Sequence, residues 1–172
     1  AFGEYIPFSQ YFPSIKEQFK EIGNLTFGEE IKAFNFKDIA KIGVMICYED
    51  IIESFSNKIA SKKPNIFINL TNDGWFLQSN EQDLHKMISI YRTLENRIFL
   101  IRATNTGRSV VIDAVGRLKK ELPLYEQGGM NYDVPILNSV TIYQYIGYYV
   151  PYGYLLIIIG LVYREKRKKL LT

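Results

Sequence analysis

The C-terminal segment constrains the architecture of this chain more than any other feature of the sequence. No charged residue occurs between Asp133 and Arg164, and residues 143–163 are apolar or aromatic apart from Gln144. A helix that spans a bilayer needs about 20 such residues, so the segment predicts one transmembrane helix. A buried strand or a core helix is the alternative, and Pro151 argues against one straight helix through the whole stretch.

The residues that follow this segment are basic. Five of the six residues from 164 to 169 are Lys or Arg. Cytoplasmic flanks of membrane helices carry an excess of these residues, so we expect the C-terminus in the cytoplasm and the preceding residues on the outer side. The chain then divides into a folded region over residues 1–135, a linker and transmembrane helix over residues 136–164, and a basic tail over residues 165–172.

Apolar runs and helical patterns alternate along the folded region. The clearest helix covers residues 81–97, where apolar side chains recur at spacings of three and four. We expect further helices over residues 14–23 and 50–61, and strands over residues 29–37, 41–47, 65–70, 98–103, 108–115 and 117–122. This order predicts the α/β class, with helices covering a sheet.

Charge and cysteine content exclude several classes of protein. The formal net charge is +3 and its surplus lies in the C-terminal basic run, so no basic stripe for a nucleic acid crosses the folded region. A single cysteine cannot form an intrachain disulfide. One His and one Cys that lie far apart in the sequence cannot make a zinc site by themselves.

Cys47 ends the apolar run 41–47 and precedes the polar residues Tyr48, Glu49 and Asp50. α/β folds place reactive groups at the carboxyl ends of strands, and a helix that starts here would direct backbone N–H groups at the sulfur. Such groups favour a thiolate and stabilise an oxyanion. From these residues alone, Cys47 could instead be a small buried hydrophobe and Glu49 a first-turn helix charge.

The triplet Cys47-Tyr48-Glu49 after a strand resembles the nucleophile motif of the nitrilase, or carbon–nitrogen hydrolase, superfamily. Four further segments, residues 2–7, 72–76, 85–97 and 102–107, resemble the apolipoprotein N-acyltransferase branch and occur in that family's order. The C-terminal apolar helix falls where the family has its last membrane span. The resemblance covers nearly the whole chain and implies part of an α-β-β-α sandwich with a Glu-Lys-Cys triad.

By this resemblance Cys47 is the nucleophile, and the backbone N–H of Tyr48 helps to stabilise the oxyanion. Glu4 matches a second carboxylate that the family places beside the triad, and Glu49 could orient a neighbour or touch the substrate. The alternative for Glu4 is a loop carboxylate paired with a surface lysine.

Trp75 and Phe76 resemble aromatic residues that gate the substrate in the family, although core packing would also explain them. His85 faces away from the apolar stripe of its helix, and we interpret it as structural. Asn105 and Gly107 are interpreted as turn residues.

The reaction implied by the resemblance moves a fatty acyl chain from a membrane phospholipid, through a Cys47 thioester, to the N-terminal amino group of a diacylglyceryl-cysteine lipoprotein. The implied partners are the phospholipid, the lipoprotein and the membrane, without a cofactor or a metal. The implied location is the bacterial inner membrane, with the catalytic domain on the periplasmic side. A nitrilase-type amidase and an inactive membrane-bound remnant are the alternatives.

In the family the triad Glu and Lys precede the segment that matches residues 2–7, and this sequence begins at that segment. We therefore expect an incomplete fragment without acyltransferase activity of its own, with one face of its sheet exposed. Lys16 and Lys20 lie on the wrong side of the motif and are assigned no role.

Overall fold

The computed structural model describes residues 28, 30–76 and 79–171, and of these the side chains of Trp75, Phe76 and residues 169–171 are not described. Glu4 and the helix expected over residues 14–23 lie outside the described residues. All six predicted strands and the two remaining predicted helices of the folded region are present, which confirms the α/β class.

Six strands form one mixed sheet in the order of the sequence. β2 (Ala40–Ile46), β3 (Ile66–Thr71) and β4 (Phe99–Thr104) run parallel at its centre. β1 (Ala33–Phe36) pairs with β2, and β5 (Val110–Ile112) and β6 (Leu118–Glu121) follow β4, all in antiparallel pairs. The central strands are apolar runs because a parallel sheet is usually covered on both faces.

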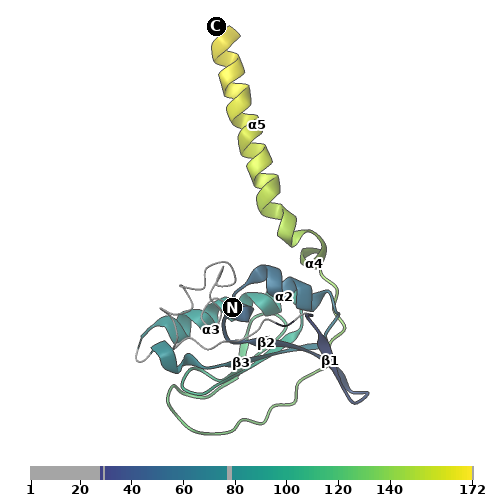
Figure 1. Ribbon diagram of the computed structural model, residues 1–172, viewed down its shortest axis with the longest axis vertical. Helices are drawn as coiled ribbons and strands as arrows, with labels where there is room; N and C mark the ends of the chain where they lie inside the picture. Colours follow the sequence, from purple (N-terminus) through teal and green to yellow (C-terminus); the bar gives the residue numbers. More distant parts are fainter. Residues whose placement is uncertain (1–27, 29, 77–78, 172) are drawn as a thin grey trace, which may run out of the picture.

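Two helices, α2 (Glu53–Ala60) and α3 (Glu81–Asn96), cover one face of this sheet (Figure 1). The main core lies between the sheet and these helices. Its buried side chains come from both layers: Met45, Ile59, Ala60, Phe67, Ile98, Leu100, Val110 and Ile112.

The opposite face of the sheet is only partly covered. Residues 122–141 cross it without regular structure, and Tyr132, Val134 and Leu137 pack there against a second buried cluster. Ile46 and Leu70 pair in register at the end of β2 and β3, and they are 53% and 49% exposed. Among the described residues, the apolar side chains at this end of the face are therefore about half exposed.

The prediction of a helix over residues 50–61 is wrong about the residue at which the helix begins. Residues Cys47–Asp50 form a separate 3-10 turn, η1, and α2 begins only at Glu53, after an extended Ile52 with φ −85° and ψ 100°. The physical reason is Asp50, whose side chain is fully buried in ionic contacts and is not turned outward in the first turn of a longer helix.

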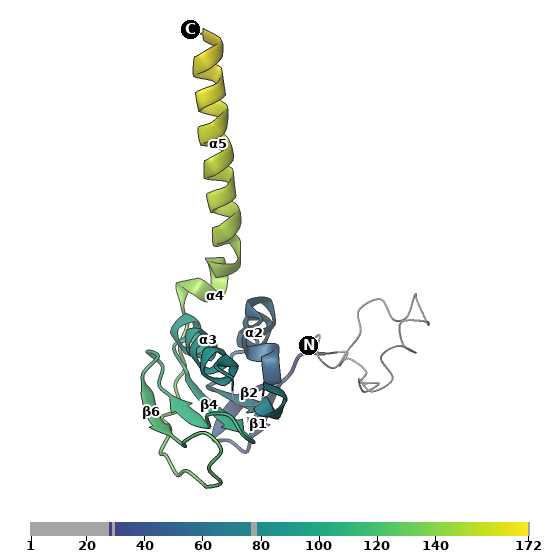
Figure 2. The ribbon, with the colours of Figure 1, turned by 90° about the vertical axis from the view of Figure 1, so that its left-hand side faces the viewer.

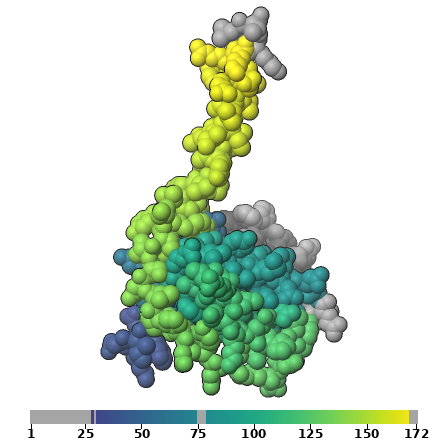
Figure 3. Space-filling view, turned by 180° about the vertical axis from the view of Figure 1, so that it is seen from behind, coloured from purple at the N-terminus to yellow at the C-terminus, as the bar shows by residue number. Residues whose placement is uncertain are grey.

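The C-terminal segment forms α4 (Ile142–Ile146), the 3-10 turn η3 (Gly147–Tyr149) and α5 (Val150–Leu171). Pro151 lies in the first turn of α5, where its missing N–H interrupts no helical hydrogen bond. The stretch Ile142–Lys168 is long and apolar enough to cross a membrane, and only 6% of its apolar window is buried. A core helix would be covered, whereas α5 projects away from the folded region (Figures 1 and 3).

Candidate active site

The carboxyl ends of the three parallel strands meet at one edge of the sheet, and polar residues follow each of them. Cys47 follows β2, Asn72 and Asp73 follow β3, and Asn105 follows β4. The loops are joined there, since the Asp73 N–H donates to Asn105 Oδ1 at 3.1 Å. Within the loop after β3, the Gly74 N–H donates to Asn72 Oδ1 at 3.1 Å. This edge is where open α/β sheets hold ligands.

Cys47 has a left-handed backbone, with φ +50°. A residue with a side chain pays about 1–3 kcal/mol in such sparsely populated regions, which persist where the surroundings enforce them. Two contacts do so here: Asn69 Nδ2 donates to the Cys47 carbonyl at 2.9 Å, and Glu49 Oε2 accepts from the Ile46 N–H at 2.7 Å. The thiol is therefore presented on a sharp, braced turn directly after a strand, and Cys47 is half-buried.

Arg102 lies beneath this turn and binds both of the acidic residues near it. Its guanidinium donates to Asp50 Oδ2 at 3.0 Å and to Asp73 Oδ2 at 3.1 Å, and all three side chains are fully buried. A third bond, 3.2 Å long, runs to Asn69 Oδ1. Because Asn69 in turn holds the Cys47 carbonyl, Arg102 links η1, β3 and the loop after β3 in one buried network.

His85 completes the same network from α3. Its Nε2 lies 2.7 Å from Asp50 Oδ1 and its Nδ1 lies 3.3 Å from Asp73 Oδ1. Burial alone would lower the pKa of His85, but the bonds to the two carboxylates outweigh it and raise this pKa above its usual value. Burial likewise opposes ionisation of Asp73, yet His85 and Arg102 hold the pKa of Asp73 below its usual value. The network thus joins two carboxylates to Arg102 and to an imidazole whose protonated form they favour.

Tyr48 joins the nucleophile turn to the start of α3. Its ring stacks on the imidazole of His85, with centroids 4.6 Å apart and planes 9° apart. Its hydroxyl donates to Glu81, and burial, followed by this bond, raises the pKa of Tyr48 well above its usual range. The phenol therefore stays protonated and positions the turn.

Possible metal ligands also gather here, since ligand atoms of Asp73, Glu81 and His85 lie within 4.8 Å of one another. However, both ring nitrogens of His85 already contact carboxylates, and Arg102 already supplies a cation to Asp73. The third member, Glu81, accepts the Tyr48 hydroxyl, and its Oε2 is buried without a hydrogen-bond partner among the described residues.

The structure brings some predicted site residues together and leaves others undescribed. Cys47, Tyr48 and Glu49 share η1, and Glu49 braces the backbone of that turn. Trp75 and Phe76 lie in the 3-10 turn η2 (Asp73–Phe76), at the same edge of the sheet. The helix N-terminus expected at the sulfur is corrected to a single 3-10 turn, because α2 starts six residues after Cys47.

Sequence reasoning missed Asp50, Asn69, Asp73 and Arg102 as members of the site. Asn69 and Arg102 interrupt the apolar runs of β3 and β4 and are fully buried. A polar residue at a core-facing position of a central strand requires a partner. That requirement is the signal by which these residues could have been found.

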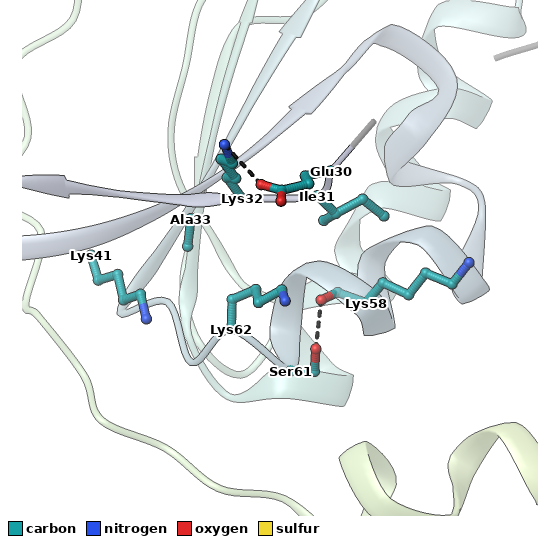
Figure 4. A pocket seen from close by; sticks show the side chains of 8 residues that line it. All are labelled: Glu30, Ile31, Lys32, Ala33, Lys41, Lys58, Ser61 and Lys62. Atoms are coloured by element: carbon teal, nitrogen blue, oxygen red, sulfur yellow. Dashed lines mark hydrogen bonds and ion pairs between the residues drawn. The ribbon is translucent and has the colours of Figure 1, made fainter. Parts of the chain in front are cut away.

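A separate hollow of about 590 Å³ lies between β1 and α2, away from this site (Figure 4). Its lining residues are Glu30, Ile31, Lys32, Ala33, Lys41, Lys58, Ser61 and Lys62. None of these eight residues belongs to the network around Cys47, and four of them are lysines.

Residues 4–142 match the family model described as Carbon-nitrogen hydrolase. The chain belongs to this carbon–nitrogen hydrolase family. The fold agrees with that of a carbon–nitrogen hydrolase from Helicobacter pylori G27, with a TM-score of 0.54, 16% identity and coverage of 63% of this chain and 44% of that chain. It agrees equally with an amidase from Nesterenkonia sp., with a TM-score of 0.53, 18% identity and coverage of 63% and 42%.

Within the family, the sequence is similar to apolipoprotein N-acyltransferases. The enzyme of Geobacter metallireducens is 30% identical over 146 residues, which cover 85% of this chain and 28% of the relative. Apolipoprotein N-acyltransferase 1 of Treponema denticola is 35% identical over 150 residues, with coverage of 85% and 27%. The Haemophilus ducreyi enzyme is 31% identical over 172 residues, with coverage of 98% and 34%. The chain therefore spans about three tenths of the length of these relatives.

Proposed function

We propose that this chain carries the nucleophile of an apolipoprotein N-acyltransferase. Cys47 accepts a fatty acyl group from a membrane phospholipid and passes it to the N-terminal amino group of a diacylglyceryl-cysteine lipoprotein. The observation that carries the proposal is the left-handed, braced backbone of Cys47 at the carboxyl edge of β2.

The chemistry takes place in two acyl transfers. In the first, the Cys47 thiolate attacks the ester carbonyl of the phospholipid, a C–S bond forms, the ester C–O bond breaks, and the alkoxide leaves with a proton as lysophospholipid. In the second, the neutral amine attacks the thioester, a C–N bond forms, the C–S bond breaks, and the amine proton is lost as the thiolate returns. This is covalent catalysis with ping-pong kinetics.

The buried network supports this assignment because it holds the backbone of the nucleophile turn in place from beneath. Arg102 and His85 neutralise Asp50 and Asp73 beneath η1, so the strain at Cys47 is maintained by contacts that lie behind it. The related fold of the Nesterenkonia sp. AN1 amidase carries acrylamide added at its active-site cysteine. That adduct is a thioether and not an acyl-enzyme, so it supports only the nucleophilic role of a cysteine on this fold.

A general base and a cation complete the site in this proposal. They are a glutamate and a lysine from a further segment of the catalytic domain, since the chain spans about three tenths of its relatives. The glutamate removes the thiol proton, and the lysine together with the Tyr48 N–H stabilises the oxyanion. Glu4 is the second carboxylate, which orients this lysine or shuttles the proton, and Trp75 and Phe76 gate the substrate.

The membrane placement follows from the two lipid substrates. α5 spans the bacterial inner membrane, the folded region lies on the periplasmic side, and the basic end of the chain lies in the cytoplasm. This places Cys47 on the side where the acceptor lipoprotein awaits its last acyl chain.

The experiment follows the acyl group. Membranes that contain the chain, with and without the segment that supplies the base and the lysine, are incubated with phospholipid carrying a heavy-isotope acyl chain. Peptide mass spectrometry should find that acyl group on Cys47 only in the complemented sample, and a Cys47→Ala variant should show none. An acyl group on another residue, or thioester formation by the chain alone, would contradict the assignment of roles.

A further inference from the structure

α3 presents a row of apolar side chains to the outside. Leu84, Met87, Tyr91 and Leu94, here named the α3 stripe, recur at helical spacing and are all exposed, with Met87 and Tyr91 each at 58%. A contiguous exposed apolar surface on a soluble face marks a place where another protein or a membrane binds.

The polar face of α3 prevents this stripe from turning inward. His85 is bonded to Asp50 and Asp73, as described above, and Arg92 Nη1 donates to Ser56 Oγ at 2.9 Å on α2. Rotation of the helix would break these bonds and leave buried charges without partners, which is costly. The α3 stripe is therefore a fixed outward surface.

The helix that carries this stripe lies on the side of the sheet from which α5 rises (Figures 1 and 2). α2 and α3 lie between the sheet and α4, and α5 continues from α4 away from the sheet (Figures 1 and 2). α4 is bonded to the end of α3, because Thr141 Oγ1 donates to the Glu95 carbonyl at 2.5 Å and Gln144 Nε2 donates to Asn96 Oδ1 at 3.1 Å. The start of the anchor is thus bonded to the C-terminal end of α3.

The outer side of α4 is apolar as well. Its polar residues bind α3 and α2, whereas Ile142 is 77% exposed, and Tyr145 and Ile146 are exposed beside it. Since Thr141 contacts Glu95, the exposed apolar residues of α4 follow directly on the C-terminal end of α3.

We propose that the α3 stripe and the outer side of α4 rest in the interfacial layer of the same bilayer that α5 crosses. This inference rests on the proposed insertion of α5 and adds a second contact with the membrane. The residue types of these two surfaces favour lipid over a protein partner. Tyrosine rings prefer the level of the lipid headgroups. A helix with one apolar and one polar face lies in the plane of the membrane interface.

The contact also explains how a lipid ester reaches the thiol. The α3 stripe begins at Leu84, one turn from Glu81, and the Glu81 carboxylate accepts the Tyr48 hydroxyl next to Cys47. A domain that lies with α3 along the bilayer holds the nucleophile edge at the lipid surface. The phospholipid then needs to rise only from the interface to be attacked.

Collision accessibility of nitroxide labels tests this arrangement. The full chain with Cys47→Ser, so that no other thiol reacts, is reconstituted in vesicles of phosphatidylethanolamine and phosphatidylglycerol. Single cysteines are introduced as Met87→Cys and Tyr91→Cys on the stripe, Ile158→Cys within α5, and Asp38→Cys in the exposed β1–β2 turn as the aqueous control. Accessibility to oxygen and to a water-soluble nickel chelate is measured for each label.

The proposal predicts that nickel-chelate accessibility at positions 87 and 91 falls several-fold below that at position 38, while oxygen accessibility rises. If position 158 is accessible to oxygen and not to the chelate, whereas positions 87 and 91 are as accessible to the chelate as position 38, the inference is overturned and the anchor stands. If position 158 is also accessible to the chelate, both the anchor and this inference are overturned. Protection of 87 and 91 from both reagents overturns it too, because a protein then covers the stripe.

Discussion

Replacement of Arg102 by methionine is the sharpest perturbation of the buried network. Arg102→Met keeps most of the side-chain volume and removes the cation that Asp50 and Asp73 share at 3.0 and 3.1 Å. Both carboxylates are fully buried, so neither can regain water. Breaking a buried ion pair by removing one partner costs about 3–5 kcal/mol.

A matched control on the surface gives the comparison. Arg108 also binds two carboxylates, those of Asp83 and Glu121, but its partners are 44% and 27% exposed. Exposed ion pairs contribute at most about 1 kcal/mol, so Arg108→Met should have a small effect. Addition of Asp73→Asn to Arg102→Met should recover part of the loss, because one unpaired carboxylate is then gone.

Pulse proteolysis of the full chain in detergent, over a series of urea concentrations, measures the free energy of unfolding of the folded region. With a urea m value of about 1.5 kcal/mol per molar, a loss of 3 kcal/mol shifts the midpoint by about 2 M. Equal midpoints for Arg102→Met and Arg108→Met would refute the argument that the buried network holds the fold and the nucleophile turn together.

Three other predictions concern a glycine, a buried carboxylate and the membrane topology. Gly107→Ala should lose about 1–3 kcal/mol of stability, because the added Cβ would lie 2.0 Å from Asp73 Oδ2. Gly129→Ala is the control and should lose none, because no atom lies within 4 Å of its added Cβ. The urea midpoints of the two variants are compared. Burial raises the pKa of Glu95 to about 7 from 4.5. The stability that protonated Glu95 contributes is therefore complete below pH 4.5 and is lost as the pH rises through 7. Glu95→Gln should flatten this dependence in urea midpoints measured from pH 4 to 8. A reporter fused after Thr172 should be active in the cytoplasm, and a periplasmic signal would reverse the proposed topology.

Much of this fold could be predicted because its elements have strong local patterns. The apolar runs of β2, β3 and β4 were visible in the sequence, as was the helical spacing in α3. The direction of α3 was not visible: its spacing of apolar residues indicates a helix but does not say which face is buried. Here the polar face turns inward, because His85 is required by the acidic residues beneath η1.

The buried network itself depends on contacts that sequence patterns do not contain. Asp50 meets His85 35 residues later and Arg102 52 residues later. Each of these residues has an ordinary local interpretation, as a helix charge, a helix residue or a strand residue. Only the parallel pairing of the central strands brings them together. Cys47 could be proposed from its position and motif, but its left-handed backbone and bracing contacts could not.

The most direct measurement of the central claim is a chase of the acyl group from Cys47. The complemented membranes are first loaded with labelled phospholipid, the remaining donor is removed, and a peptide with an N-terminal diacylglyceryl-cysteine is added. The account predicts that label leaves Cys47 at the rate at which it appears on the α-amino group of the peptide. Label that instead appears as free fatty acid would show that water is the acceptor, and the chain would then belong to a hydrolase rather than to an acyltransferase.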